Sequence, residues 1–353
     1  MHINAIARAA SIAAVALLAG ALAGCGGSGS GDAATPEATL PEELLAPVLD
    51  FRLEGWEKTD FAKHSVPFDE FLSGGPPKDG IPPIDAPRFV RVAETTYLEP
   101  REPVIELTIR GETRAYPIQI LIWHEIVNDE LGGVPVAVTF CPLCNTAIAF
   151  DRRVEGRTLD FGTTGKLRHS DLVMYDRQTE SWWQQFGGEA LVGRYTGTRL
   201  KRLPARIVAW ADFARAHPRG QVLTRETGHT RSYGDNPYEG YDDVDSPPIF
   251  PVPGDKRLPP KERVVYVERG SESVAVPYSV LARKRTMWVE LGGGTLVFRW
   301  RGGVASALDA GEIASGRDVG AADVTENGKR VAFSEPFWFA IAAFDPDVRI
   351  IER

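Results

Sequence analysis

The residues best suited to chemistry in this 353-residue chain are two cysteines, Cys141 and Cys144, in the tract TFCPLCNTAIAFDR. Apolar, β-prone runs flank them at residues 134–140 and 147–150, so we expect CPLC to form the turn of a β-hairpin. Such a turn points both sulfur atoms to one side, as in the knuckles that bind zinc or iron through thiolates. The pair therefore predicts a soft-metal site, for copper or zinc, or a reactive dithiol.

Two cysteines supply only two ligands, so a mononuclear metal site needs donors from elsewhere in the chain. His124 is the best candidate, because it lies in the element just before the hairpin; a core histidine bonded to a backbone carbonyl is the alternative. Met174, in HSDLVMYDR, is a fourth candidate ligand if the metal is copper, and a core methionine is the alternative. His169 could replace Met174, although we favour an exposed loop histidine there.

The element that must position His124 follows Pro117, a residue that can occupy the first turn of a helix. Residues 118–129, IQILIWHEIVND, are apolar almost all round, which indicates a buried helix. On that helix, His124 shares a face with Ile120 and Val127.

Two segments of the chain resemble each other: GETRAYPIQIL at residues 111–121 and SESVAVPYSVL at residues 271–281. Each is followed by a paired-strand pattern, VPVAVTF with AIAFDRR in the first case and MWVEL with TLVFRWR in the second. Repetition of this kind is typical of duplicated units, and chance similarity is the alternative. We therefore predict an α+β fold, mostly antiparallel β with a few helices, with an internal duplication of a strand-helix-hairpin unit.

The third cysteine, Cys25, ends an export signal. Arg8 precedes an apolar stretch at residues 9–23, and LAGC at residues 22–25 has the form of a bacterial lipoprotein cleavage box. We predict that Cys25 becomes the lipidated first residue and anchors the protein to a bacterial membrane, on the periplasmic face or the cell surface. In an oxidising compartment, a lone CxxC pair either closes as a disulfide or is protected by a metal.

These signals predict the domain organisation. We expect a lipoprotein signal peptide at residues 1–25, a flexible tether at 26–40, a Pro-rich lead-in at 41–87 and a single body at 88–353, with its cysteines in the first half (88–250) and none in the second (251–353). The net charge of -8 argues against a nucleic-acid partner. GTTGK at residues 162–166 lacks the other residues of a phosphate loop, so no nucleotide is expected either.

The chain also resembles a known family. The tracts AYPIQILIWHEIVND, VPVAVTFCPLCNTAIAFDR, LVMYDRQTESWWQQ, DNPYEGYDD, LPPKERV and FWFAIAAFDP together resemble the bacterial family called domain of unknown function 3179, from about residue 88 to the C-terminus. The resemblance implies no established activity. It implies a pattern of site residues, here His124, Glu125, Cys141, Cys144 and Met174. His169 departs from the asparagine that the resemblance leads us to expect, which weakens it as a ligand.

Three hypotheses follow for the function. The first is a membrane-tethered, extracytoplasmic metal-binding protein with Cys141, Cys144, His124 and Met174 as ligands for copper or zinc, in metal delivery or electron transfer. The second is a thiol-disulfide redox enzyme with a cysteine nucleophile and His124 as its base. The third is a structural or binding lipoprotein stapled by a CxxC disulfide. We favour the first, which assigns no catalytic residue, has the membrane as a partner through the lipid on Cys25, and leaves any protein partner unknown.

Overall fold

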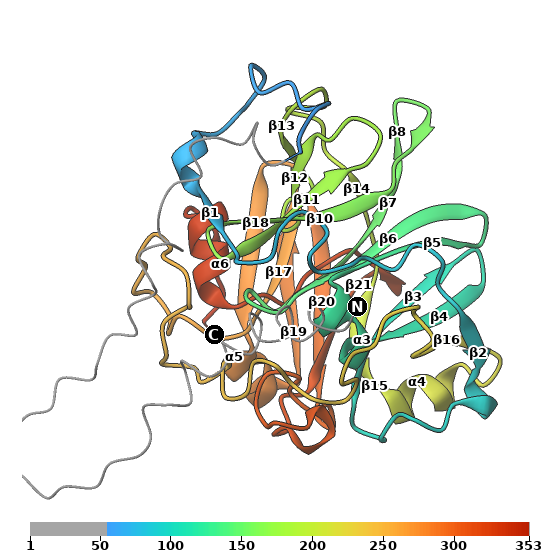
Figure 1. Cartoon of the computed structure of the whole chain (residues 1–353). Coiled ribbons are helices and arrows are strands. Elements are labelled where there is room, and N and C mark those ends of the chain that lie inside the picture. Colours follow the sequence, from blue (N-terminus) through green and yellow to red (C-terminus); the bar gives the residue numbers. More distant parts are fainter. Residues whose placement is uncertain (1–54, 353) are drawn as a thin grey trace, which may run out of the picture.

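A computed structural model describes residues 55–352 of the chain (Figure 1). The predicted signal peptide, the predicted lipidation site at Cys25 and the predicted tether lie outside the described residues. Among residues 55–352, every helix is too short or too polar to span a membrane.

Three sheets, which we call A, B and C, form the larger part of the molecule. Sheet A has the order β1 (Phe71–Ser73), β10 (Phe161–Arg168), β11 (Asp171–Asp176), β12 (Trp182–Gln184) and β13 (Ala190–Val192). Sheet B has the order β14 (Lys201–Leu203), β7 (Thr146–Asp151), β6 (Val134–Cys141) and β5 (Ile126–Leu131). Sheet C has the order β15 (Arg206–Ala209), β3 (Pro103–Ile109), β4 (Glu112–Pro117), β16 (Gln221–Leu223) and β2 (Phe89–Arg91).

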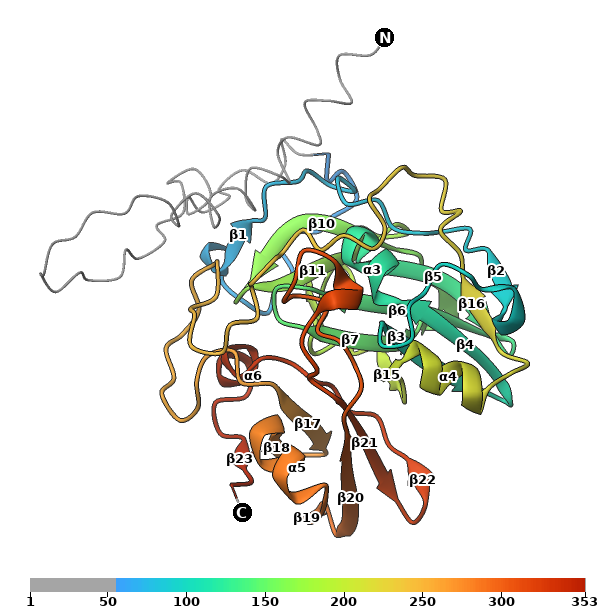
Figure 2. The same cartoon turned by 90° about the horizontal axis from the view of Figure 1, so that it is seen from below.

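Two further sheets, D and E, come from the C-terminal part of the chain and lie together beside the larger part (Figure 2). Sheet D has the order β17 (Val264–Arg269), β18 (Glu272–Pro277) and β23 (Arg349–Ile350). Sheet E has the order β19 (Thr286–Leu291), β20 (Gly294–Arg301), β21 (Ala321–Glu326) and β22 (Lys329–Arg330). The short strands β8 (Arg153–Val154) and β9 (Arg157–Thr158) form a separate ribbon.

The helices of the described residues are short connections between strands. They are α3 (Ile118–His124), α4 (Trp210–Ala216), α5 (Tyr278–Lys284) and α6 (Trp338–Phe344), with 3₁₀ turns η2 (Phe68–Glu70), η3 (Val92–Glu94) and η4 (Ile313–Ser315). Each α-helix has seven residues, about two turns, which is too short to build a layer of its own. The hydrophobic core therefore lies between sheets. Its largest cluster joins residues of sheets A, B and C and contains both Cys141 and Cys144.

The predicted α+β class with an internal duplication is wrong. Strands make up 40% of the structure and helices 12%, and the sheets are arranged like five blades of a propeller, so the fold is mostly β. Residues 103–141 and 264–301 do share an order of strands and helix. This local likeness does not make a two-copy fold, because sheet A has no second version in sheets D and E.

The predicted buried helix at residues 118–129 is also too long. Helix α3 ends at His124, and Glu125 adopts a left-handed backbone with φ of +59° while its N–H donates to the Leu121 carbonyl at 2.7 Å. The chain then continues as β5, which contains Val127. The β-branched residues after Glu125 favour a strand. Because residues 118–129 are almost all apolar, their hydrophobic pattern has neither the helical nor the strand period that would have separated α3 from β5.

A buried ion cluster ties the C-terminal sheets to the rest of the chain. Asp242 is 1% exposed and lies in the irregular segment between sheets C and D. Its carboxylate binds Arg317 at 2.6 Å and Arg263 at 3.2 Å, and it accepts a hydrogen bond from Ser306. The cluster therefore fixes the segment that crosses from one part of the molecule to the other.

We expect Asp242→Ala to lower the free energy of unfolding by about 3–5 kcal/mol, because it leaves Arg263 without a carboxylate in a largely buried position. Urea unfolding of the full-length protein measures the loss. Asp245→Ala, at an exposed position of the same segment, is the control and should change stability by less than about 0.5 kcal/mol. Equal, small losses in the two variants would contradict the role given to this cluster.

Candidate metal centre

The two cysteines lie where the sequence predicts, in the turn of a β-hairpin. Strands β6 and β7 pair antiparallel, and Cys141 is opposite Thr146 across the turn. Asn145 closes the turn with φ of +58°, a left-handed conformation that asparagine tolerates better than most residues. Both cysteines are free thiols, and both are buried. The predicted CPLC hairpin is confirmed.

A carboxylate that sequence analysis did not select joins the two thiols. Within the described residues, Cys141, Cys144 and Asp171 form a group in which one ligating atom of each lies within 4.8 Å of the others. The Cys144 Sγ is 2.8 Å from Oδ1 of Asp171. Asp171 is the first residue of β11, so the group joins the hairpin of sheet B to sheet A.

A tight turn places Asp171 at the start of its strand. His169 and Ser170 connect β10 to β11 with φ of +52° and +58°, the two left-handed positions of a type I′ hairpin turn. Asparagine is favoured at such positions, which explains physically why the family resemblance leads us to expect it at residue 169. The His169 Nε2 lies 3.4 Å from the Glu70 carboxylate, and His169 is not in the cysteine group.

Hydrogen bonds hold the second oxygen of Asp171 and leave the first facing Cys144. Oδ2 of Asp171 accepts bonds from Nε2 of Gln184 at 2.5 Å and from the backbone N–H of Phe186 at 2.9 Å. On the other side, Thr146 Oγ1 lies 2.8 Å from the Cys144 sulfur and donates to Gln185. Partners of this kind fix the orientation of metal ligands in known sites.

Burial dominates the electrostatics of the group. It raises the pKa of both thiols, and the Asp171 carboxylate adds to the rise. Burial also raises the pKa of Asp171, although its hydrogen bonds oppose the change. No salt bridge reaches Asp171 from any of the described residues. The charge of Asp171 does act on the buried Arg202 guanidinium, whose pKa it raises against the effect of burial.

Glu125 adds a further carboxylate beside the group. It is 7% exposed, and among residues 55–352 no hydrogen bond or salt bridge reaches its side chain. Burial, followed by the charge of Asp171, raises the pKa of Glu125 to about 8. Its charge in turn helps to raise the pKa of the Cys141 thiol, so this carboxylate lies in the electrostatic field of the cysteine group.

Two tyrosines cover the group from the irregular segment before sheet D. The Tyr241 hydroxyl donates to the Leu143 carbonyl, inside the CPLC turn, at 2.9 Å. Tyr238 packs against the core cluster that contains the cysteines; burial raises its pKa, and the charges of Glu125 and Cys141 raise it further. Lys261 holds this cover in place, because its Nζ donates to the Tyr241 carbonyl at 2.5 Å.

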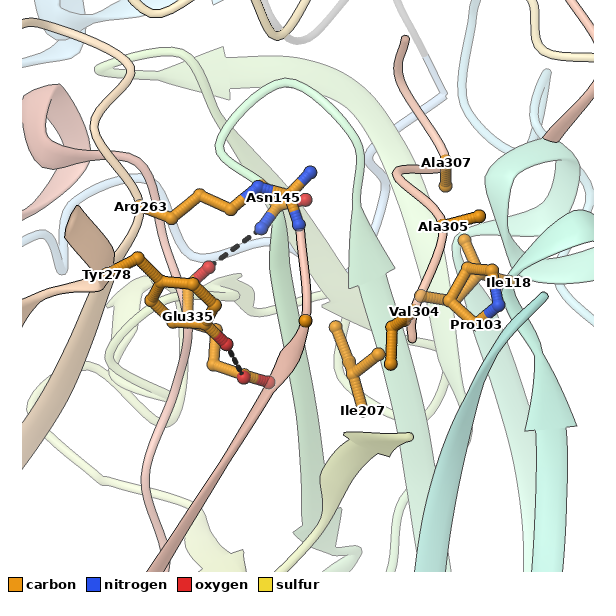
Figure 3. Close-up of a pocket in the computed structure, with 11 residues that line it drawn as sticks. Pro103, Ile118, Asn145, Ile207, Arg263, Tyr278, Val304, Ala305, Ala307 and Glu335 are labelled. Atoms are coloured by element: carbon orange, nitrogen blue, oxygen red, sulfur yellow. Dashed lines mark hydrogen bonds between the residues drawn. The ribbon is translucent and has the colours of Figure 1, made fainter. Parts of the chain in front are cut away.

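The C-terminal segment packs against the turn at Asn145 (Figure 3). The Phe337 N–H donates to the Cys144 carbonyl at 2.9 Å, and the Asn145 amide donates to the Glu335 carbonyl at 2.8 Å. Tyr278 donates to the Glu335 carboxylate behind it. The cavity left at this junction has a volume of about 10 Å³, the size of one water molecule, so it is a packed contact and not a substrate pocket.

The structure does not bring His124 into the cysteine group. Its Nδ1 donates to the Pro82 carbonyl at 2.7 Å, and its Nε2 accepts from the Tyr233 hydroxyl at 2.7 Å, so both ring nitrogens already have partners. Met174 is fully buried on β11, three residues after Asp171, and packs in the same core cluster as the cysteines. Asp171 lies between His169 and Met174 in the tract HSDLVMYDR, which sequence analysis searched only for histidine and methionine.

Family comparison agrees with the resemblance seen in the sequence. Residues 78–348 match the family described as Protein of unknown function (DUF3179). The chain belongs to this family. The matched region of the DUF3179 family contains every residue of the cysteine group and Glu125. No curated protein and no solved structure matches the chain, so its function must be argued from the site itself.

The buried His124 ring predicts a pH dependence of stability. Burial lowers its pKa from 6.5 to about 4. In the unfolded chain the ring takes up a proton near pH 6.5, whereas in the folded protein it does so only near pH 4. The contribution of His124 to the free energy of unfolding is therefore fully present above pH 6.5 and is lost as the pH falls from 6.5 towards 4. At pH 5 the loss should be about 2 kcal/mol. Urea unfolding at pH 7.5 and pH 5 measures it.

His124→Asn should remove this part of the pH dependence. His64→Asn, at an exposed position, should retain it. The same pH-dependent loss in His124→Asn as in the unmodified protein would show that another group is responsible.

Proposed function

We propose that this protein binds a single zinc ion through Cys141, Cys144 and Asp171. The observation that carries the proposal is the convergence of three buried ligating atoms within 4.8 Å. Ionised acidic groups that are buried together are costly in a medium of low dielectric constant, and a divalent ion lowers that cost. Glu125, buried beside the group without a partner among the described residues, adds to the demand for positive charge.

The donor set favours zinc over copper. Zinc accepts thiolate sulfur and carboxylate oxygen in tetrahedral sites, whereas Cu(I) selects soft thiolate and thioether ligands. The group contains two sulfur donors and one oxygen donor, while His124 is engaged elsewhere. Three protein ligands leave one of the four tetrahedral positions open. Glu125 is not one of the three ligands, but its charge helps to raise the pKa of the Cys141 thiol.

The enclosure of the group favours a retained, structural ion. Tyr241 and Phe337, whose rings lie 6.1 Å apart, both bond to the CPLC turn, and closed sites of this kind contribute directly to folding. Zinc undergoes no redox change, so the role that we propose for the ion is stabilisation of the fold, in place of electron transfer or metal delivery. Buried thiols with a raised pKa are poor nucleophiles, which argues against the thiol-enzyme alternative.

The proposal keeps the exported, membrane-tethered setting suggested by the sequence. The LAGC box at residues 22–25 supports lipidation of Cys25 and location outside the cytoplasm. An oxidising compartment converts an unprotected CxxC pair to a disulfide, and a tightly held ion protects the thiols from this oxidation.

Elemental analysis tests the binding site directly. The full-length protein, purified in detergent without chelator, should carry about one zinc per chain, and Cys141→Ser and Asp171→Asn should each lose it. His124→Asn and Met174→Leu are the matched controls and should keep the ion. Metal-free protein with a Cys141–Cys144 disulfide would contradict the proposal and favour the staple. Loss of zinc in His124→Asn would return that residue to the ligand set.

Removal of the ion tests its structural role. Treatment with a strong zinc chelator should lower the melting temperature of the unmodified protein by at least about 5 °C, because the free energy of metal binding contributes to folding. Differential scanning calorimetry measures the shift. Cys141→Ser serves as the control, since a protein that holds no ion should melt at the same temperature with and without chelator. If the chelator removes zinc and the melting temperature does not change, the proposal that the protein binds zinc stands, but the stabilising role is refuted.

A further inference from the structure

A second site lies apart from the cysteine group, in a cleft between sheet E and the elements β15 and α4. The cleft has a volume of about 480 Å³, and none of the cysteine-group residues lines it. Five arginines and three carboxylates line it, so its walls carry an excess of positive charge. The chain as a whole has a net charge of -8, so this local excess is opposite in sign to the average of the protein.

The three carboxylates that line the cleft all form ion pairs. Arg206 of β15 binds Asp323 of β21 at 3.1 Å and Glu106 of β3 at 3.0 Å. Arg301 of β20 binds Asp212 of α4 from the opposite wall. These pairs join the two walls, and each of the three lining carboxylates is thereby engaged.

Two arginines of the lining are left without a carboxylate among the described residues. Arg299 lies directly opposite Asp323 on β21, but Asp323 binds Arg206 instead, and Arg299 donates only to the Thr325 hydroxyl at 3.2 Å. Within residues 55–352, the Arg285 side chain makes no hydrogen bond, and its guanidinium lies 4.4 Å from the centre of the Trp300 ring. Both side chains are exposed and line the cleft.

The backbone holds Arg285 in a fixed position at the end of α5. Its φ of +65° is left-handed, a conformation that an arginine rarely adopts, and its carbonyl accepts from the Trp300 N–H at 3.0 Å. Gly320 packs against the Trp300 ring so closely that a Cβ at this position would lie 2.3 Å from a ring atom. A hydrogen bond from Trp300 Nε1 to the Val319 carbonyl at 3.2 Å also holds the ring against which the Arg285 guanidinium packs.

We infer that this cleft binds a small ligand carrying carboxylate or phosphate groups, with Arg285 and Arg299 as the residues that contact its oxygen atoms. Guanidinium groups match the geometry of both oxyanions and bind them through paired, charge-assisted hydrogen bonds. The rigid walls reduce the loss of conformational freedom on binding. This site is independent of zinc, because its residues and those of the cysteine group do not overlap.

Isothermal titration calorimetry of the full-length protein in detergent tests the inference, with inorganic phosphate and succinate as separate probes. At least one should bind saturably with a Kd below about 1 mM at low salt. A response to phosphate alone identifies a phosphorylated ligand, and a response to succinate alone a dicarboxylate. Arg285→Gln and Arg299→Gln should each raise the Kd about tenfold or more, since each removes a charge-assisted contact.

Arg283→Gln is the matched control, because Arg283 is exposed on the same helix two residues away and does not line the cleft. Its Kd should equal that of the unmodified protein. Unchanged melting temperatures would show that the cleft variants fold normally, as expected for exposed side chains. Absence of saturable binding to either probe at about 10 mM would overturn the inference. An equal loss in Arg283→Gln would overturn it too, by showing only general attraction of anions.

Discussion

The structure depends on one electrostatic constraint, the burial of two thiols and a carboxylate against one another. Cys144 Sγ lies 2.8 Å from Asp171, and both residues are inaccessible to solvent. In a medium of low dielectric constant such groups stay protonated or share a positive ion. The same contact joins sheet A to sheet B, so the chemistry of the group and the packing of the two sheets cannot be separated.

Segments that are far apart in the chain build the enclosure around this contact. The hairpin supplies the thiols and β11 supplies Asp171, while Tyr241 and the segment at Phe337 pack together and bond to the turn. Buried polar groups are tolerated because nearly every one has a partner, as the bonds to Oδ2 of Asp171 show. Glu125 is a buried carboxylate whose side chain makes no hydrogen bond within residues 55–352, and carboxylates with a strongly raised pKa are typical of functional sites.

Local features of the sequence predicted local features of the structure. The CPLC hairpin was predictable because two β-prone runs and a Pro-containing turn are adjacent in the chain. The length of α3 was not predictable, because residues 118–129 are almost all apolar and show no pattern that separates a helix from a strand. The change from α3 to β5 occurs at a single residue with a left-handed backbone, Glu125. The fold class was missed for a related reason: helices of two turns leave a clear sequence signal but form no layer.

The sequence by itself determined the family and the position of the two thiols in a shared turn. Only the tertiary structure decided which side chain joins those thiols. Asp171 is 27 residues from Cys144 along the chain and reaches it through the packing of two different sheets. His124 lies closer in sequence, yet it points to Pro82 and Tyr233. Periodicity and spacing act over a few residues, whereas the contacts that assemble a buried site depend on how whole sheets pack.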